Sequence, residues 1–302
     1  MRMKTLKSKQ PTAFIDYGEK TFGESAAVVL PVPYDGTITW TTWGAGCSKG
    51  PAAIIRASPQ LEIYDEELET EPSTMKGIHT MPAIKPAKKP EQVVGQVADA
   101  VGKILAAKKF PIVLGGEHSI TPGSVRAAKK FYPDLTVLQF DAHSDLRDEY
   151  KGTKWSHACA ARRCADEGAK IVQVGLRSIC DEDSWFIEKF PQRVKAFLMK
   201  DEDKWTADDV AAACGKNVFI SFDLDAFDSS VMPATSTPEP GGLSWKRALS
   251  IIRRVAQTSR IVGADVVELS PTNGLFYPDF TAAKLAYKII SYALFPEKLG
   301  KK

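Results

Sequence analysis

Short apolar runs alternate with helical patterns along most of the chain, and no other feature of the sequence constrains the fold as strongly. The runs have the length of buried strands, whereas the segments between them repeat apolar residues with a helical period. Strands that alternate with helices predict a mostly parallel sheet covered on both faces. The expected strands are residues 26–31, 110–114, 135–140, 171–175, 194–198, 218–222 and 261–267. The expected helices are residues 51–61, 93–108, 121–131, 157–168, 245–258 and 280–294.

No linker rich in glycine, serine or proline and no internal repeat divides the chain into separate units. Its 302 residues are enough for one large domain, and we expect a single catalytic domain over residues 1–302. The basic start is not followed by an apolar run, so we expect no secretory signal and a flexible terminus over residues 1–12. Residues 71–89 contain several prolines and are predicted to form a surface excursion.

Composition argues against two classes of partner. The 40 basic and 37 acidic side chains give a net charge of +3, which is too balanced for a nucleic-acid-binding surface. No apolar run approaches the ~20 residues that span a bilayer, so we expect no membrane partner. The five cysteines lack metal-site and redox-motif spacing, and we expect reduced thiols in a cytoplasmic protein. These cysteines are Cys47, Cys159, Cys164, Cys180 and Cys214.

The residues that follow the expected strands are the first place to look for a site, because parallel sheets bind ligands outside the carboxyl ends of their strands. Gly115 and Gly116 follow residues 110–114 and let the backbone turn tightly before His118. Taken alone, His118 is better explained as a structural histidine of the core or a loop than as a ligand.

A second expected strand, residues 135–140, is followed by charged residues with a spacing of two. Asp141, His143 and Asp145 share one face if the strand continues. Two carboxylates and an imidazole packed this closely repel and desolvate one another unless they bind a cation. A solvated turn is the alternative, but the apolar residues before it favour a metal site.

A third expected strand, residues 218–222, ends in the same way. Asp223 and Asp225 share a face, whereas Asp228 is out of phase and is assigned a supporting role. An acidic turn without a ligand is again the alternative.

Together the three strand ends supply four aspartates and two histidines, which is more than a single zinc site uses. Six ligands dominated by carboxylate suit two metals with bridging carboxylates, and hard oxygen ligands favour manganese. Two metals about 3.5–4 Å apart bridge one water and lower its pKa, which creates hydroxide at neutral pH. We therefore expect two Mn²⁺ per chain.

Several ordered motifs along nearly the whole chain are similar to those of the ureohydrolase family, which contains arginases and agmatinases. The chain resembles microbial agmatinases most, because residues 156–159 read Ser-His-Ala-Cys and residues 146–155 lack the arginase pattern. The resemblance implies an arginase-like, three-layer α/β/α fold with a mostly parallel, roughly eight-stranded central sheet. The motifs cover residues 44–58, 115–119, 141–145, 221–228, 233–242 and 265–271.

The resemblance also implies how the ligands are shared between the two metals. One manganese would be held by His118, Asp141, Asp145 and Asp223. The other would be held by Asp141, His143, Asp223 and Asp225. Asp141 and Asp223 would therefore bridge the two ions.

Three further residues receive roles from the resemblance. Glu268 would anchor the guanidinium, with an exposed strand-end glutamate as the alternative, and Thr237 would line the substrate. His157 would be the proton shuttle, and the alternative is a helix-start histidine behind a Ser156 cap. His79 matches no family ligand and is interpreted as a structural or surface histidine.

Departures from the family pattern lie in and near the substrate loop and leave every predicted metal ligand intact. Ser236 replaces a usual glycine, Leu269 and Ser270 replace the common Val-Asn pair, and Ser229 stands where proline is frequent. These differences leave the shape of the substrate loop open.

We therefore expect manganese-dependent hydrolysis of a guanidinium group, with agmatine and water giving putrescine and urea in polyamine biosynthesis. A metal-bridging hydroxide would attack the guanidinium carbon, and the metals with Glu268 would stabilise the intermediate. Asp145 would pass a proton to the departing amine, and His157 would relay protons to solvent while titrating near neutral pH. The site would be negatively charged, which attracts a small cationic guanidino substrate.

Other functions remain as alternatives. Arginine or a guanidino acid is one, because Arg147, Lys151 and Lys154 could meet a carboxylate. A non-catalytic metal-binding regulator would be expected to have lost a ligand or Glu268, and an amide hydrolase or deacetylase would use one zinc. The family usually assembles into trimers or hexamers, so we expect a homotrimer or homohexamer.

Overall fold

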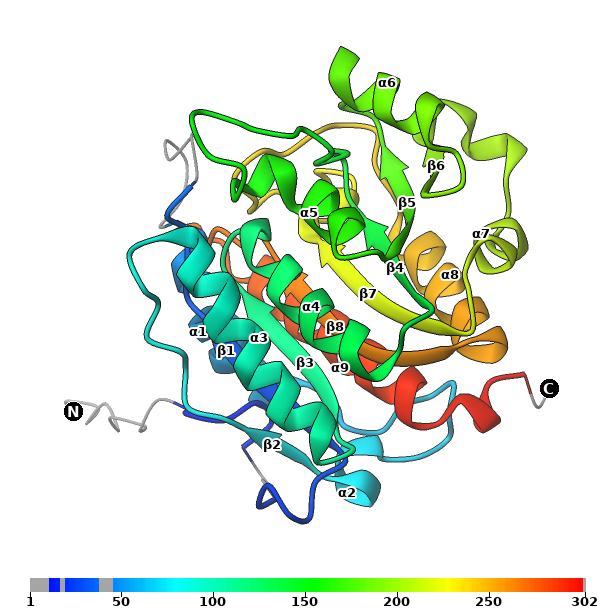
Figure 1. Ribbon diagram of the computed structural model, residues 1–302. Helices are drawn as coiled ribbons and strands as arrows, with labels where there is room; N and C mark the ends of the chain where they lie inside the picture. Colours follow the sequence, from blue (N-terminus) through cyan, green and yellow to red (C-terminus); the bar gives the residue numbers. More distant parts are fainter. Residues whose placement is uncertain (1–10, 17–19, 38–45, 301–302) are drawn as a thin grey trace.

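Eight short segments pair side by side as one sheet in the part of the chain that the structure describes (Figure 1). The structure is a computed structural model that describes residues 11–16, 20–37 and 46–300. The strand order is β2-β1-β3-β8-β7-β4-β5-β6, and every pairing between neighbours is parallel. The strands are β1 (Ala27–Val32), β2 (Ile78–Thr80), β3 (Phe110–Gly115), β4 (Leu135–Phe140), β5 (Lys170–Leu176), β6 (Val194–Leu198), β7 (Asn217–Asp223) and β8 (Arg260–Val267).

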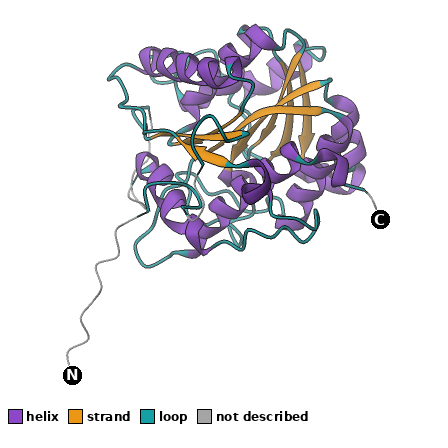
Figure 2. Cartoon of the chain, turned by 90° about the horizontal axis from the view of Figure 1, so that it is seen from below, coloured by secondary structure: helices purple, strands orange, loops and turns teal. Residues whose placement is uncertain are grey.

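Helices cover both faces of the sheet and complete three layers, as Figure 2 shows. Parallel strands need crossover connections, and helices supply most of them. In Figure 1, α3, α4 and α5 lie in front of the sheet, while α1, α8 and α9 lie behind it. The helices are α1 (Gly50–Ala57), α2 (Pro72–Lys76), α3 (Pro90–Ala106), α4 (Thr121–Phe131), α5 (Ala160–Asp166), α6 (Asp181–Lys189), α7 (Ala207–Ala213), α8 (Trp245–Thr258) and α9 (Tyr277–Leu294).

Each face of the sheet has its own hydrophobic core. On one face, α3 packs Val97 and Val101 against β1 and β3. On the other, α8 packs Ile252 and Val255 against the sheet and against α9. The start of α8 is fixed by Ser244, whose side chain accepts a hydrogen bond from a backbone amide of the first turn. Each fully buried valine or isoleucine contributes about 1.5–3 kcal/mol.

The expected three-layer fold is confirmed, and β4, α4 and α8 have the predicted bounds. The interpretation of residues 71–89 as a surface excursion is wrong in part, because α2 and β2 lie there and β2 pairs with β1. With three residues, β2 is too short to show a hydrophobic period, so a pattern in the sequence does not reveal it.

Two further helix expectations differ from the structure. Residues 157–168 were expected as one helix but form a 3₁₀ turn, His157–Cys159, followed by α5. Helical segments are expected between the strands at residues 171–175, 194–198 and 218–222 but without bounds, and the structure has α6 and α7 there, each with an acidic first turn. The expected flexible terminus falls mainly on residues 1–10, which lie outside the described residues. Among the described helices, none is long and apolar enough to cross a membrane.

Candidate active site and metal centre

Four neighbouring strands at the centre of the sheet, β3, β8, β7 and β4, end at the same edge because all four are parallel. The predicted site residues follow these ends. His118 comes after β3, Asp141 after β4, Asp223 at the end of β7 and Glu268 after β8. The sheet thereby joins residues 150 positions apart, as where the backbone amide of His118 donates to the carboxylate of Glu268.

His118 faces three carboxylates at once. Its Nδ1 lies 3.0 Å from an oxygen of Asp141, 3.1 Å from Asp145 and 3.4 Å from Asp223. All four side chains are more than nine-tenths buried. One imidazole nitrogen carries at most one proton and cannot satisfy three carboxylates, whereas a cation can.

His143 completes a second group beside the first. Its Nδ1 lies 2.9 Å from Asp225 and 3.6 Å from Asp141. Asp141 belongs to both groups, and the ligand atoms of each group lie within 4.8 Å of one another. All six predicted ligands therefore meet in one place, and Asp141 has the position of a bridging carboxylate.

The ligands do not all lie on continued strands, which corrects in part the expected alternation along a strand. Regular β4 ends at Phe140, an isolated parallel bridge still pairs His143 with Ser178, and the backbone leaves the extended conformation at Asp145, whose φ is 52°. After β7, Asp223 accepts a hydrogen bond from the amide of Asp225 in a 3₁₀ turn. The carboxylate of Asp225 then accepts the amide of Ala142 at 2.9 Å, which ties the two turns together.

A serine behind the cluster determines which nitrogen of His118 faces the carboxylates. The hydroxyl of Ser221 donates to Asp265 at 2.8 Å, and its oxygen lies 2.9 Å from Nε2 of His118. Because Ser221 has given its only proton to Asp265, Nε2 must be the donor, and Nδ1 of the neutral ring keeps a lone pair. A lone pair surrounded by three carboxylates is a donor set for a cation.

Without a cation, this cluster retains protons. Burial acts to lower the pKa of His118, but hydrogen bonds with Asp141, Asp145 and Asp223 raise it well above its ordinary value. For His143, burial is likewise outweighed by the neighbouring carboxylates, which raise its pKa to about 12. Burial, then the charge of Asp141, raises the pKa of Asp145 to about 7. The donor set therefore fits divalent cations, which would take the place of these protons.

Metal binding to the stripped protein is expected to release about two or more protons per chain at pH 7. Each imidazole must lose one proton to bind a metal, because its raised pKa keeps it protonated beforehand, and Asp145, with a pKa of about 7, is partly protonated as well. Apparent metal affinity should therefore rise with pH. Titration calorimetry with MnCl₂ in two buffers of different ionisation enthalpy counts the protons, and equal heats in both buffers would contradict this.

Glu268 lies beside the cluster, and three donors hold its carboxylate. The amide of His118 donates to Oε1 at 2.7 Å, while the Ser236 hydroxyl at 2.8 Å and the Cys47 thiol at 3.2 Å donate to Oε2. Burial, then the charge of Glu117, raises the pKa of Glu268 to about 7. Glu268 is buried rather than an exposed strand-end residue, and Ser236, the departure from the family's glycine, contacts it directly.

His157 lines the same cavity from the opposite loop. Ser156 caps the 3₁₀ turn by accepting the amide of Ala158, so the capping interpretation is correct, yet the histidine still lies at the site. Burial, followed by the charges of His118 and His143, lowers the pKa of His157 to about 4. This differs from the expected titration near neutral pH, mainly because the imidazole is buried. His157 is therefore neutral at pH 7.

The loop at residues 233–242 is held against the site by two side chains. Asp228 accepts the amides of Gly241 at 2.7 Å and Gly242 at 3.2 Å, which agrees with a supporting role. Arg177, which sequence reasoning missed, donates to several backbone carbonyls of this region, including that of Glu239 at 2.7 Å. Thr237 lies in the loop and lines the cavity.

The cavity has a volume of about 250 Å³. Asp183, which sequence reasoning also missed, lines this cavity and is buried. One of its oxygens accepts the amide of Cys180 at 3.1 Å, and the other has no hydrogen-bond partner among the described residues. Arg147 also lines the cavity, with its guanidinium 5.1 Å from the ring centre of Tyr150.

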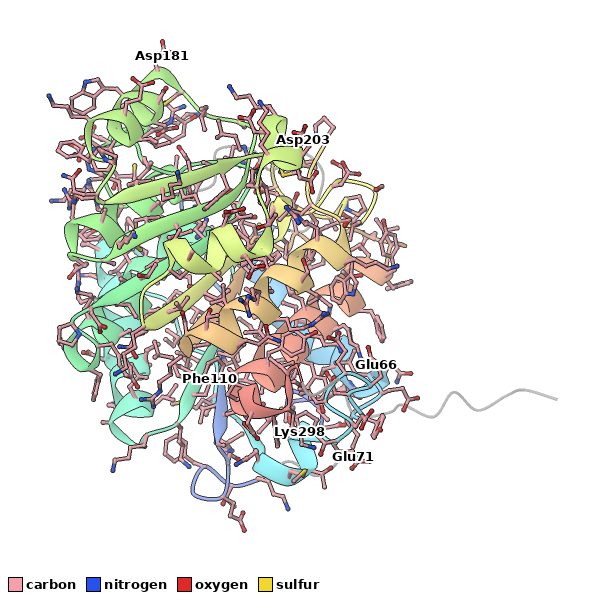
Figure 3. All side chains as sticks on the ribbon, turned by 90° about the vertical axis from the view of Figure 1, so that its right-hand side faces the viewer. Glu66, Glu71, Phe110, Asp181, Asp203 and Lys298 are labelled. Carbon is pink, nitrogen blue, oxygen red and sulfur yellow. The ribbon has the colours of Figure 1, made fainter. Side chains whose placement is uncertain are left out.

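A second cavity, of about 560 Å³, contains none of the predicted site residues among the described residues that line it. Glu66 and Lys298 contribute to its wall, and Figure 3 shows both far from Asp181, the first residue of α6. His79 lies on β2, where its Nδ1 is 3.0 Å from the carbonyl of Lys20, in agreement with a structural role.

Residues 25–295 match the sequence model of the arginase family. The chain belongs to the arginase family. It is 39% identical over 279 residues to the N(1)-aminopropylagmatine ureohydrolase of Synechocystis sp., and the aligned region covers 90% of each chain. It is 30% identical over 271 residues to the agmatinase of Pyrococcus horikoshii, covering 87% of this chain and 90% of the relative.

Solved structures of the family have the same fold. The agmatine ureohydrolase of Thermoplasma volcanium superposes with a TM-score of 0.84 at 30% identity, covering 97% of both chains. The arginase of Medicago truncatula gives 0.77 at 25% identity, covering 93% of this chain and 94% of the other. The expected family, fold and enzyme class, a hydrolase of guanidino carbon–nitrogen bonds, are therefore confirmed.

Proposed function

We propose that this protein hydrolyses the guanidinium group of agmatine to putrescine and urea, with two manganese ions held by His118, Asp141, His143, Asp145, Asp223 and Asp225. The observation that carries the proposal is that two buried carboxylates outside the predicted metal ligands, Glu268 and Asp183, line the same cavity as those ligands. One oxygen of Asp183 lacks a partner among the described residues. A substrate with two cationic groups complements both carboxylates.

Side chains of this protein and the bound metals would each carry out a different part of the reaction. Glu268 would receive the guanidinium through charge-assisted hydrogen bonds and orient its carbon. The metals, when bound, would supply Lewis acidity and a hydroxide nucleophile. Asp145 lies within the cluster and would hand a proton to the departing amine. His157 lines the same cavity, and burial lowers its pKa, so the neutral ring can accept a proton from the site.

N(1)-aminopropylagmatine is a second candidate substrate. The relative with this printed activity is 39% identical to the chain, against 30% for the agmatinase of Pyrococcus horikoshii. Its additional aminopropyl group would extend the substrate beyond the first amine and add a further cationic group. Arginine has weaker support, because the buried Asp183 would repel its carboxylate, although Arg147 also lines the cavity.

The test is urea release from agmatine, N(1)-aminopropylagmatine, arginine and guanidinobutyrate, with manganese-loaded and metal-stripped protein side by side. We expect manganese-dependent urea from agmatine, with kcat/KM at least about 100-fold above that for arginine, because a misplaced buried charge costs several kcal/mol. A higher kcat/KM for N(1)-aminopropylagmatine would keep the mechanism and change the substrate. No urea from any compound, with two metals bound, would refute the proposal.

Replacing His157 with alanine is expected to lower kcat by about 100-fold while both metals stay bound. The side chain contributes no ligand atom to either metal group, so its loss removes proton transfer alone. His79→Ala is the matched control, since this histidine lies on β2, and its kcat should equal that of the wild type. Metal analysis accompanies the kinetics, and loss of metal from His157→Ala would contradict the shuttle role.

A further inference from the structure

Thr37 and Glu117 are not among the predicted metal ligands. Glu117 contacts Thr37, and Thr37 in turn contacts His157. Glu117 is fully buried between the end of β3 and the loop after β1. Its carboxylate accepts the amide of Thr37 at 2.8 Å on Oε2 and the hydroxyl of Thr37 at 2.7 Å on Oε1. Ser119 also donates to Oε1. Glu117 thus receives three donors and fixes both the backbone and the side chain of Thr37.

Thr37 contacts His157 through a single oxygen. Its Oγ1 accepts the backbone amide of His157 at 3.0 Å and lies 3.2 Å from Nδ1 of the ring. A threonine hydroxyl has one proton and two lone pairs. The proton is committed to Glu117, because a carboxylate can only accept. The remaining contact with the ring therefore requires a proton on Nδ1.

We infer that Glu117, acting through Thr37, holds His157 in the Nδ1–H tautomer and so leaves Nε2 free to accept a proton from the cavity. Both are positioning residues, and the inference rests on the proton-transfer role of His157 in the proposed function. Which nitrogen of a catalytic histidine carries the proton is set by the hydrogen bond of the other, and only the unprotonated nitrogen acts as a base.

The close approach of the two loops is built into the backbone. Gly116 precedes Glu117, and a Cβ atom at this position would lie 1.9 Å from the carbonyl oxygen of Tyr34. The amide of Glu117 donates to that same carbonyl at 2.8 Å. Burial raises the pKa of Glu117, while the hydrogen bonds from Ser119 and Thr37 oppose the rise. Glu117 and Thr37 therefore occupy fixed positions beside the site.

The inference predicts losses of different size for two nearly isosteric changes. In Glu117→Gln, the amide oxygen can still accept the Thr37 amide, so its NH₂ group faces the hydroxyls and donates to them. The Thr37 proton is then free to turn towards Nδ1, which selects the Nε2–H tautomer and blocks the base. In Thr37→Val, neither tautomer is selected. We expect kcat to fall by about 10- to 100-fold in Glu117→Gln and by less in Thr37→Val.

Thr37→Ser keeps the hydroxyl and is the matched variant, so it should restore most of the turnover lost in Thr37→Val. KM should change by less than about threefold in all three variants, because the tautomer acts on proton transfer and not on substrate binding. Metal content is measured in each, since Glu117 precedes His118. Equal losses of kcat in Thr37→Ser and Thr37→Val would overturn the inference.

The tautomer itself is read by nitrogen-15 NMR of histidine-labelled protein loaded with diamagnetic zinc. The chain has four histidines, and His157→Ala identifies the signal of interest. We expect Nδ1–H in the wild type and Nε2–H in Glu117→Gln. Nε2–H in the wild type would overturn the inference. If no guanidino compound yields urea, the proposed function fails, yet this spectrum still decides whether Thr37 and Glu117 fix the ring.

Discussion

Asp141→Asn is expected to reduce kcat/KM for the substrate by on the order of 10⁴-fold, the scale seen when the group that generates or activates a nucleophile is removed. Asp141 is the residue common to both candidate metal groups, and it is 1% exposed. An asparagine keeps the shape but not the charge, so neither ion would keep its full set of ligands.

Measurements on the same variant, Asp141→Asn, distinguish loss of metal from unfolding of the protein. A metal that binds only the native state raises the midpoint of thermal unfolding, so adding metal to the stripped wild type should raise its midpoint. This rise should be absent in Asp141→Asn. Without metal, the variant should unfold at a lower temperature than the stripped wild type, because the change removes the charge that contacts both His118 and His143. Thermal unfolding with and without MnCl₂, together with metal analysis, tests both statements.

Asp65→Asn is the matched control. Asp65 is also fully buried, and its carboxylate lies 3.0 Å from Lys288 outside the metal groups. Its replacement should lower stability by leaving Lys288 with weaker partners, while the folded protein keeps two metals and its kcat. If Asp141→Asn retained two tightly bound metals, the assignment of Asp141 as a bridging ligand would be wrong.

The clustering of the candidate metal ligands could be predicted because each lies in a short motif at a strand end. Asp141, His143 and Asp145 span five positions after an apolar run, so their proximity does not depend on the rest of the fold. The expected shared strand face holds only in part, since a parallel bridge extends to His143 but Asp145 leaves the extended conformation. A positive φ, as at Asp145, leaves no periodic signal in the sequence.

The residues behind the ligands could not be predicted, because their contacts depend on strand order and loop packing. Ser221 and Asp265 are directly opposite one another in the pairing of β7 with β8, and they meet only because these strands are neighbours. Thr37 and Glu117 are 80 positions apart and join two loops at one edge of the sheet. Local spacing contains no information about either pair.

The role of the glycines before His118 could also be predicted only in part. The sequence suggested that Gly115 and Gly116 provide a tight turn, but neither has a positive φ. A Cβ at Gly115 would lie 2.7 Å from Val267. At both positions the glycine allows a close approach between segments distant in the sequence, which a single strand and its turn do not reveal.

Glu268→Gln is expected to lower kcat/KM by about 10³-fold while both metals remain bound. Glu268 contributes to neither metal group, and glutamine can still accept the amide of His118. The charge is lost, and a buried guanidinium would then have no counter-ion, which costs about 3–5 kcal/mol. Glu268→Asp keeps the charge but shortens the reach, so its loss should be smaller. Metal analysis and steady-state kinetics of both variants test this.

The pH dependence of kcat/KM provides an independent test of the same anchor. The pKa of Glu268 is raised to about 7, so the carboxylate is protonated below that pH and charged above it. A cationic guanidinium binds the charged form, and kcat/KM in the wild type should therefore rise as pH increases through about 7. Glu268→Gln has no such group, and its profile should lose this limb. If the pH profile of Glu268→Gln kept its acid limb, the titration would belong to another residue. The role of Glu268 as the guanidinium anchor would then be tested only by the size of the kcat/KM loss in this variant.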